Sequence, residues 1–279
     1  MSRVLVVGAG SPLGTAVGAA LAAEGHEVHG VSRRGRGKGE MVDITEPKAA
    51  RELLQRIRPV VVVYLARPEL PTEDVEAAIE SASDAVGWFA TQCHEEGAAR
   101  ILFASSAAVY GTAAVAPRSE DDPTPAPGPY AQLKLRSERA LDEVARAIGI
   151  VAVSLRIFNV YGPGFSGSLV NRLADASTGG APPTVFATDG FVRDYVHRDD
   201  VAAAFTAAAA SPALDSGVLN VGTGVGTGNL ELLSLIPGAQ WLPGSELGAP
   251  SVSVADVSRL RTALGVSPIP LIEALRRRG

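Results

Sequence analysis

Short apolar runs alternate with helix-length segments through the first half of the chain, and this alternation constrains the fold more than any other feature. Four runs have strand length and a largely continuous apolar character: residues 3–10, 60–66, 100–106 and 151–158. Such runs are typical of strands that helices cover on both faces. A helical pattern follows the first of them and is closed by Gly25. We therefore expect an α/β fold with a doubly wound parallel sheet of the Rossmann type.

The second half of the chain is less regular. Glycine and proline dominate residues 161–183, and the later strands and helices are short. We expect a main domain at residues 1–160 and a smaller region at residues 161–279, with some segments of the latter returning to the main sheet. A helix is expected at residues 197–210 with Asp199 or Asp200 at its N-cap. The acidic stretch 120–122 is interpreted as a solvated turn.

Composition excludes several classes of partner. The 279 residues carry a net charge of −5, which argues against nucleic acid or an anionic membrane as a ligand. The longest apolar run is too short to span a bilayer, and the strand pattern from residue 3 leaves no room for a signal peptide. Cys93 is the only cysteine, so we expect an inert buried thiol, no internal disulfide and no metal site. These observations predict a soluble, cytoplasmic protein.

A glycine-rich turn joins the first strand to the first helix. Gly8, Gly10 and Gly14 stand in a G-x-G-x-x-x-G spacing, one residue longer than the usual G-x-G-x-x-G. Such glycines allow a tight turn whose backbone N–H groups approach a pyrophosphate at a helix N-terminus. A plain strand-to-helix turn is the alternative interpretation. The position within a βαβ pattern favours dinucleotide binding by residues 1–160.

The end of the second strand carries a basic loop. Dinucleotide-binding folds that hold the ribose 2′-hydroxyl have an acidic residue at this point, whereas here Ser32 is followed by Arg33 and Arg34. Guanidinium groups can bind a 2′-phosphate with paired hydrogen bonds. We therefore expect NADP(H) to be the preferred cofactor, with NAD possible. The alternative is a solvated basic loop.

Two further stretches carry residues suited to proton transfer. Ser105 and Ser106 end a predicted parallel strand, at the edge where such sheets bind ligands. Tyr130 and Lys134 are four residues apart, on one face of a predicted helix. A phenol is a poor proton carrier at neutral pH, and a nearby ammonium group stabilises its phenolate. A serine hydroxyl can donate to a substrate oxygen on which charge develops.

In this order, these segments resemble the extended short-chain dehydrogenase/reductase family, of the NAD-dependent epimerase/dehydratase type. Further matches run nearly end to end: Asp43 and Ile44, then residues 64–67, 156–164, 193–202, 220–224 and 255–265. The resemblance implies that Tyr130 is the acid/base and that Lys134 stabilises its phenolate and holds the nicotinamide ribose. It also implies that Ser106, rather than Ser105, donates to the carbonyl oxygen.

The resemblance also suggests where ligands bind. With the glycine turn and the basic loop, it gives an expected cofactor site of Gly8, Gly10, Ser11, Pro12, Leu13, Gly14, Ser32, Arg33, Arg34, Asp43, Ile44, Leu65, Ala66, Arg67, Tyr130 and Lys134. The expected substrate-binding residues, in a region that would mainly be residues 161–279, are Ser106, Asn159, Phe186 and Arg193. The implied substrate is a sugar nucleotide or another ketone, and we expect a homodimer.

The chain departs from the family pattern at several places. Ser11 and Pro12 stand where the turn usually has its fourth glycine and the residue after it, and Arg67 replaces a small residue beside the cofactor. No asparagine precedes Asn159, so a helical asparagine of the family is missing. No lysine or arginine lies between Arg198 and Arg259, so the arginine that grips the substrate diphosphate is also missing.

Residue types separate the reactions that this family performs. Ala107 and Ala108 stand where sugar dehydratases have an acid/base carboxylate pair, which disfavours dehydration. The basic loop favours a reductase that consumes NADPH. We therefore expect an NADP(H)-dependent oxidoreductase that reduces a ketone, such as the C4 carbonyl of a nucleotide-linked sugar. A nucleotide-sugar 4-epimerase with tightly bound NAD is the main alternative, and a non-catalytic dinucleotide sensor is a third.

Overall fold

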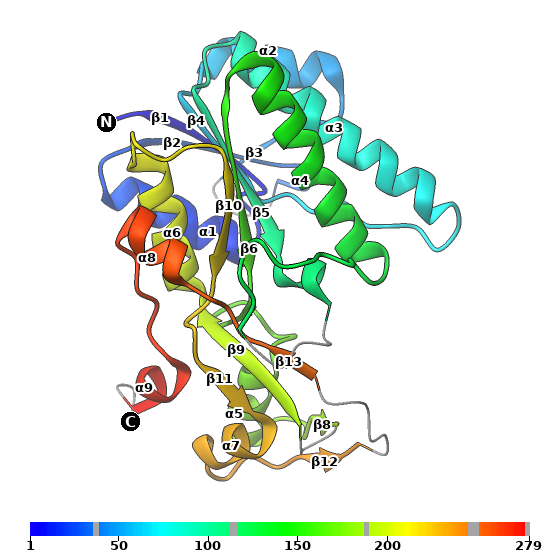
Figure 1. The fold of residues 1–279 in the computed structure, drawn as a ribbon, viewed down its shortest axis with the longest axis vertical. Helices are drawn as coiled ribbons and strands as arrows, with labels where there is room; N and C mark the ends of the chain where they lie inside the picture. Colours follow the sequence, from blue (N-terminus) through cyan, green and yellow to red (C-terminus); the bar gives the residue numbers. More distant parts are fainter. Residues whose placement is uncertain (36–38, 112–116, 187–189, 245–250, 277–279) are drawn as a thin grey trace.

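The computed structural model describes residues 1–35, 39–111, 117–186, 190–244 and 251–276. Its main layer is a seven-stranded sheet with the order β10-β6-β5-β4-β1-β2-β3 (Figure 1). The strands are β1 (Arg3–Val7), β2 (Glu27–Ser32), β3 (Glu40–Met41), β4 (Val61–Tyr64), β5 (Arg100–Ser106), β6 (Val151–Ile157) and β10 (Gly217–Val221). All neighbouring pairs are parallel. The prediction of a doubly wound parallel α/β sheet is confirmed.

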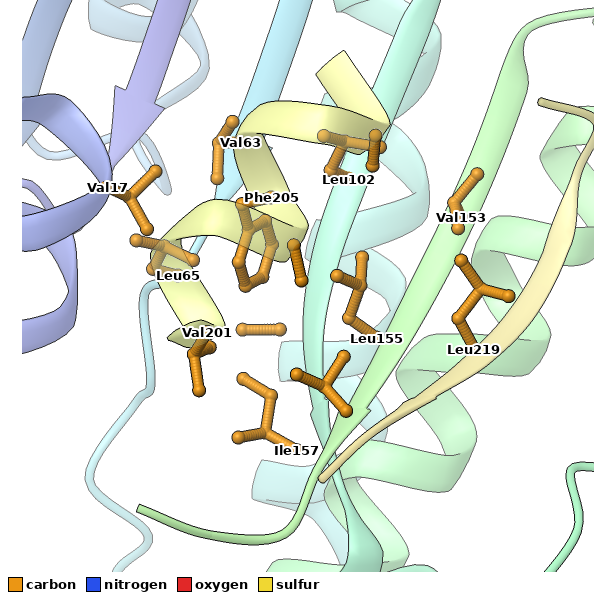
Figure 2. Packing of buried hydrophobic residues seen from close by; sticks show 14 of the residues in the cluster. Val17, Val63, Leu65, Leu102, Val153, Leu155, Ile157, Val201, Phe205 and Leu219 are labelled. Carbon is orange, nitrogen blue, oxygen red and sulfur yellow. The ribbon is translucent and has the colours of Figure 1, made fainter. Parts of the chain in front are cut away.

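Helices cover both faces of this sheet. One face packs against α1 (Pro12–Ala23), α6 (Arg198–Ala210) and α8 (Ser258–Leu264), and the other against α2 (Pro47–Ile57), α3 (Val75–Glu95) and α4 (Pro129–Ile148). Successive strand residues point to opposite faces, so Val4 belongs to the first core and Leu5 to the second. Figure 2 shows the first core, where Phe205 of α6 lies among strand residues that include Leu155. Burial on both faces explains why these strands have no polar alternation.

The helix α3 contributes to the second core. Phe89 is 1% exposed and Cys93 is fully buried, while Trp88 is partly buried against the same cluster. Cys93 is buried as expected, and burial raises the pKa of its thiol; the expected inertness of this thiol stays a prediction. The expected homodimer stays a prediction.

A second, smaller lobe follows the carboxyl edge of the sheet (Figure 1). Its strands are β7 (Asn159–Tyr161), β8 (Thr184–Val185), β9 (Phe191–His197), β11 (Gly226–Gly228), β12 (Leu242–Pro243) and β13 (Ser251–Ser253). Its helices are α5 (Leu169–Ser177), α7 (Asn229–Leu235) and α9 (Leu271–Arg276). The strand β9 pairs with β7, β11 and β13. The chain returns from this lobe to the main sheet through α6 and β10, and the proposed boundary at residue 160 stays a prediction.

Two local expectations are wrong. The helix α6 begins at Arg198, and its N-cap is His197, whose Nδ1 accepts a hydrogen bond of 3.3 Å from the backbone N–H of Asp199. The stretch 120–122 is not wholly solvated, because Glu120 is buried and accepts a 2.8 Å hydrogen bond from the backbone N–H of Asn220. Both errors arise from partners that helix-start and charge patterns do not reveal.

In the described part of the chain, no helix combines the length and the apolar character needed to cross a membrane.

Candidate active site

A cleft of about 330 Å³ opens at the carboxyl ends of β1, β2, β4 and β5. This is the edge at which open parallel sheets bind ligands. Expected cofactor residues that line it are Gly8, Gly10, Ser11, Ser32, Arg33, Arg34, Asp43, Ile44, Leu65, Ala66, Arg67 and Lys134. Most of the expected cofactor set is therefore brought together, although these residues come from five separate parts of the sequence.

The glycine turn forms one wall of the cleft, and its shape requires glycine at two positions. Gly8 has a φ of +89°, and a Cβ there would lie 2.9 Å from the backbone nitrogen of Ala66. A Cβ at Gly14 would lie 2.3 Å from the carbonyl oxygen of Gly8. Ser11 caps α1, because its Oγ accepts a 3.0 Å hydrogen bond from the N–H of Gly14. The serine that replaces a glycine here thus holds the helix N-terminus toward the cleft.

Four members of the expected set stand outside the cleft lining, and one of them is Tyr130, described below. Pro12, Leu13 and Gly14 form the first turn of α1 and do not line the cleft. Pro12 instead meets the second lobe, since a Cβ at Gly164 would lie 2.7 Å from the Pro12 Cβ. The proline that departs from the family pattern therefore joins the glycine turn to the loop that follows β7.

The basic loop is partly neutralised by an acid that the sequence analysis did not identify. Arg34 donates a 2.8 Å hydrogen bond to Glu69, on the segment that follows β4, and both side chains are more than half exposed. The Ser32 hydroxyl is buried and has no hydrogen-bond partner in the described part of the chain. Arg33 lines the cleft nearby. Residues 36–38 of this loop lie outside the described residues. A 2′-phosphate would thus compete with Glu69 for Arg34.

Tyr130 and Lys134 come together at the start of α4, as their spacing predicts. Tyr130 lies in the first turn and is 38% exposed. Lys134 is buried, its Nζ lies 6.0 Å from the centre of the Tyr130 ring, and it donates a 2.7 Å hydrogen bond to the carbonyl oxygen of Ala104. Burial, together with the Arg67 guanidinium, lowers the pKa of Lys134 to about 8, and the Glu138 carboxylate acts in the opposite direction. The ammonium group is therefore placed to titrate near neutral pH.

Arg67 completes the surroundings of this pair. Its guanidinium carbon lies 5.7 Å from the centre of the Tyr130 ring, within the range of a cation–π contact. The side chain reaches from the cleft to a tyrosine that is not part of the cleft lining. The departure from a small residue thus places a second cation beside Tyr130 and Lys134.

The two serines at the end of β5 have different surroundings. Ser105 is buried and donates a hydrogen bond to Glu138. Ser106 is partly exposed, and its Oγ accepts a 3.2 Å hydrogen bond from the N–H of Ala108 at the start of a 3-10 turn, Ala107–Tyr110. Ser106 is therefore the more accessible of the two, and its expected contact with substrate stays a prediction.

The expected substrate residues in or near the second lobe are separate from the cleft. Arg193 donates hydrogen bonds to the Ser251 carbonyl oxygen at 2.7 Å and to the Ser251 Oγ at 2.9 Å, and burial lowers the pKa of its guanidinium. Asn159 donates to the carbonyl oxygen of Asp194 at 3.3 Å. Phe186 is 51% exposed, as a residue that flanks a base would be. Arg193 and Asn159 therefore already hold parts of the lobe together.

Sequence reasoning missed two acidic residues of this region, Glu69 and Glu138. A signal existed for Glu138, because it follows Tyr130 and Lys134 at the same four-residue interval on α4. No signal existed for Glu69, since its contact with Arg34 depends on two loops that are distant in sequence.

The fold, the glycine turn and the tyrosine–lysine pair define a class of dinucleotide-dependent enzyme, and sequence comparison identifies the family. The sequence model of the NAD dependent epimerase/dehydratase family matches residues 4–222, and the chain belongs to that family. The predicted resemblance to extended short-chain dehydrogenases/reductases is confirmed, as is the prediction of an NAD(P)-dependent enzyme of this type.

Two UDP-glucose 4-epimerases match this chain over nearly their whole length. The UDP-glucose 4-epimerase of Mycolicibacterium smegmatis is 30% identical, over 99% of this chain and 96% of the relative. The UDP-glucose 4-epimerase of Lactobacillus helveticus is 28% identical, over 95% and 92% respectively.

Two solved structures give the same result. MoeE5 in complex with UDP-glucose and NAD superposes with a TM-score of 0.86 at 28% identity, covering 98% of this chain and 96% of that chain. The UDP-glucose 4-epimerase of Thermus thermophilus in complex with NAD superposes with a TM-score of 0.82 at 29% identity, with the same coverage.

Proposed function

We propose that this chain is a nucleotide-sugar 4-epimerase that works with NAD and acts on a UDP-hexose. The observation that carries the proposal is the nearly full-length likeness to UDP-glucose 4-epimerases, joined to a cleft beside the Tyr130–Lys134 pair. The main expectation of the sequence analysis, an NADP(H)-dependent ketoreductase, becomes the second candidate. Two observations favour the second candidate: Ser32 has no acidic side chain, and Arg33 lines the cleft.

The residues of the cleft fit a dinucleotide. The tight turn at Gly8 and the N-terminus of α1 suit a pyrophosphate. The buried Ser32 hydroxyl, which has no partner in the described residues, suits a ribose hydroxyl. The Arg34–Glu69 ion pair removes much of the local positive charge that a 2′-phosphate would need. Together these features support NAD over NADP(H) as the cofactor.

The chemistry follows from the positions of three side chains. When bound, NAD supplies reversible removal of hydrogen from C4 of the sugar. The Tyr130 phenolate accepts the proton of the 4-hydroxyl group. It returns this proton after the sugar has rotated so that the opposite face of C4 meets the cofactor. The Lys134 ammonium stabilises that phenolate, and the Ser106 hydroxyl donates to the 4-oxygen while its charge changes. A proton and a hydride leave and both return, so the reaction consumes no cofactor.

One experiment separates the two candidates. The purified protein is incubated with UDP-glucose or UDP-galactose, the sugars are followed by NMR, and any bound dinucleotide is identified by native mass spectrometry. An epimerase interconverts the two sugars without net oxidation or reduction and carries NAD. A protein that leaves both sugars unchanged, and instead oxidises NADPH in step with reduction of a 4-keto sugar, is the ketoreductase.

A further inference from the structure

A buried polar chain lies under the proton-transfer site. Glu138 of α4 and Arg156 of β6 are 6% and 5% exposed and form an ion pair. The Nε of Arg156 donates to both carboxylate oxygens, at 3.0 and 3.2 Å, and its Nη2 donates at 2.7 Å. Ser105 of β5 donates to the same carboxylate. Three elements of the main domain therefore meet at one buried negative charge.

The pair has further partners on the side away from the cleft. Arg156 donates to the Tyr110 hydroxyl at 2.9 Å and to the Glu120 carbonyl oxygen at 3.2 Å. Tyr110 in turn donates to the side chain of Asn220 on β10 at 2.8 Å. A buried ion pair is a weak source of stability, because the cost of desolvating both charges offsets their attraction. Stability alone therefore does not explain why the Glu138–Arg156 pair is buried here.

The placement of the pair relative to Lys134 indicates a role beyond stability. Consecutive residues of β5 hold consecutive turns of α4: the Ala104 carbonyl oxygen accepts from Lys134 at 2.7 Å, and Ser105 donates to Glu138. The next residue of β5 is Ser106. The bonds thus fix the register of α4 on the strand that presents the substrate-facing serine, and they put a carboxylate one helical turn from the ammonium group.

Resting on the roles proposed above for Tyr130 and Lys134, we propose that Glu138 is a positioning residue of the proton-transfer site. Held by Arg156 and Ser105, it supplies the negative charge and the helix register that keep the Lys134 ammonium in place beside Tyr130.

The charges around Lys134 are consistent with this role. Arg67 faces Lys134 from the segment after β4, Glu138 faces it from the same helix, and β5 presents the Phe103 ring at 4.7 Å and the Ala104 carbonyl group. Burial and Arg67 lower the pKa of Lys134 to about 8, while Glu138 raises it. Removal of the Glu138 charge would thus make the ammonium group lose its proton at a lower pH.

Glu138→Gln tests the proposal, because glutamine keeps the shape and one acceptor oxygen while it removes the charge; its NH2 group replaces the second acceptor that Arg156 and Ser105 share. The readout is the pH dependence of NAD binding, measured by fluorescence, together with the pH dependence of epimerase turnover. Both profiles should have an alkaline limb, which is the fall in NAD binding or turnover as Lys134 loses its proton at high pH. We expect this limb to move to lower pH by on the order of one unit. Ser105→Ala, which affects only the register, should lower turnover several-fold and leave the limb in place.

Two variants of α4 provide matched controls. Asp142→Asn removes an exposed carboxylate that pairs with Arg146, one turn beyond Glu138. Ser137→Ala removes a buried hydroxyl that donates to the Leu133 carbonyl oxygen of the same helix. Neither should move the alkaline limb. Thermal unfolding checks that each variant is folded. If Glu138→Gln does not fold, the double variant Glu138→Gln, Arg156→Gln replaces it, because it leaves no unpaired buried charge. The double variant should show the same shift of the alkaline limb.

The outcomes separate the two proposals. A folded Glu138 variant whose limbs stay at the wild-type pH overturns the positioning role, whatever happens to its turnover. Absence of epimerase activity in the wild type counts against the proposed function, and the NAD-binding profile then still decides the role of Glu138.

Discussion

The dinucleotide cleft and the second lobe use their polar side chains in different ways. In the cleft, the turn at Gly8 and the hydroxyl of Ser32 present groups that can meet a ligand. In the second lobe, the Arg193 guanidinium is bonded to Ser251, and the Asn159 amide is bonded to the backbone of Asp194. Asp194 is itself buried and accepts from Thr223. The comparison indicates that the cleft presents groups free to meet a ligand, whereas in the second lobe the residues proposed to bind substrate also hold the fold.

One contact joins the second lobe directly to the glycine turn of the cleft. Gly164, with a φ of +88°, brings the loop after β7 against Pro12 at the glycine turn. The same loop carries Pro163, whose carbonyl oxygen accepts a 2.7 Å hydrogen bond from Arg198 at the start of α6. The position of the loop after β7 therefore depends on the turn that would hold the cofactor.

The largest expected effect belongs to the cleft. Tyr130→Phe removes the proposed proton carrier and leaves the ring and its contacts with Arg67 and Lys134. Turnover should fall by roughly two to four decades, the usual value of positioned acid–base catalysis, while the dissociation constant of NAD changes little. Steady-state kinetics and a fluorescence titration measure the two quantities. Turnover within a few-fold of wild type would reject the assignment of Tyr130.

A second effect concerns the pH dependence of the cleft. In the role proposed for it, Lys134 acts in its charged form, and its pKa is lowered to about 8, chiefly by burial. Well below pH 8 Lys134 is fully protonated and limits neither cofactor binding nor turnover. Both should fall as the pH rises through about 8, because the ammonium group then loses its proton. Lys134→Met should lower both at every pH and remove this limb. A limb that persists in Lys134→Met would belong to another group.

Two local signals in the sequence, continuous apolar runs and helical spacing, explain which parts of the fold and of the candidate site could be predicted. The paired strands of the sheet could be predicted because burial on both faces leaves a continuous apolar run, and Lys134 could be placed because helical spacing relates it to Tyr130. The two-residue strand β3 (Glu40–Met41) is too short to show a period. The burial of Glu120 and the pairing of Glu69 could not be predicted, since each depends on a partner in a distant segment, such as Asn220.

In the second lobe we expect a smaller effect, and it should change two quantities, the affinity for UDP and the melting temperature. If Arg193 contacts the substrate diphosphate, Arg193→Ala should raise the dissociation constant of UDP by about tenfold or more, because a charge-assisted hydrogen bond is lost. The same change breaks the bonds to Ser251, so the melting temperature should fall too. NAD binding should stay the same. Calorimetry with UDP measures the first effect and thermal unfolding the second.

Ser251→Ala serves as the control for this variant, because it removes the Oγ contact with Arg193 and keeps the guanidinium group. It should lower stability and leave UDP binding within about threefold of wild type, less than the loss of a charge-assisted bond. If both variants lower stability and neither changes UDP binding, Arg193 holds only the lobe. The difference between the cleft and the second lobe would then be larger than proposed.

The smallest expected effect concerns the mouth of the cleft, where Arg34 pairs with Glu69. Exposed ion pairs contribute about 0–1 kcal/mol, so Arg34→Ala should change NAD affinity by less than about fivefold.

Glu69→Gln frees the Arg34 guanidinium and should raise affinity for NADP(H) several-fold while NAD affinity stays the same. Salt should erode this gain, because exposed charges are screened within about 8–10 Å at physiological ionic strength. Dissociation constants of NADH and NADPH for wild type, Glu69→Gln and an Arg33→Ala, Arg34→Ala double variant measure the effect. A wild type that prefers NADPH by two decades, and loses this preference in the double variant, would contradict the NAD assignment and favour the ketoreductase.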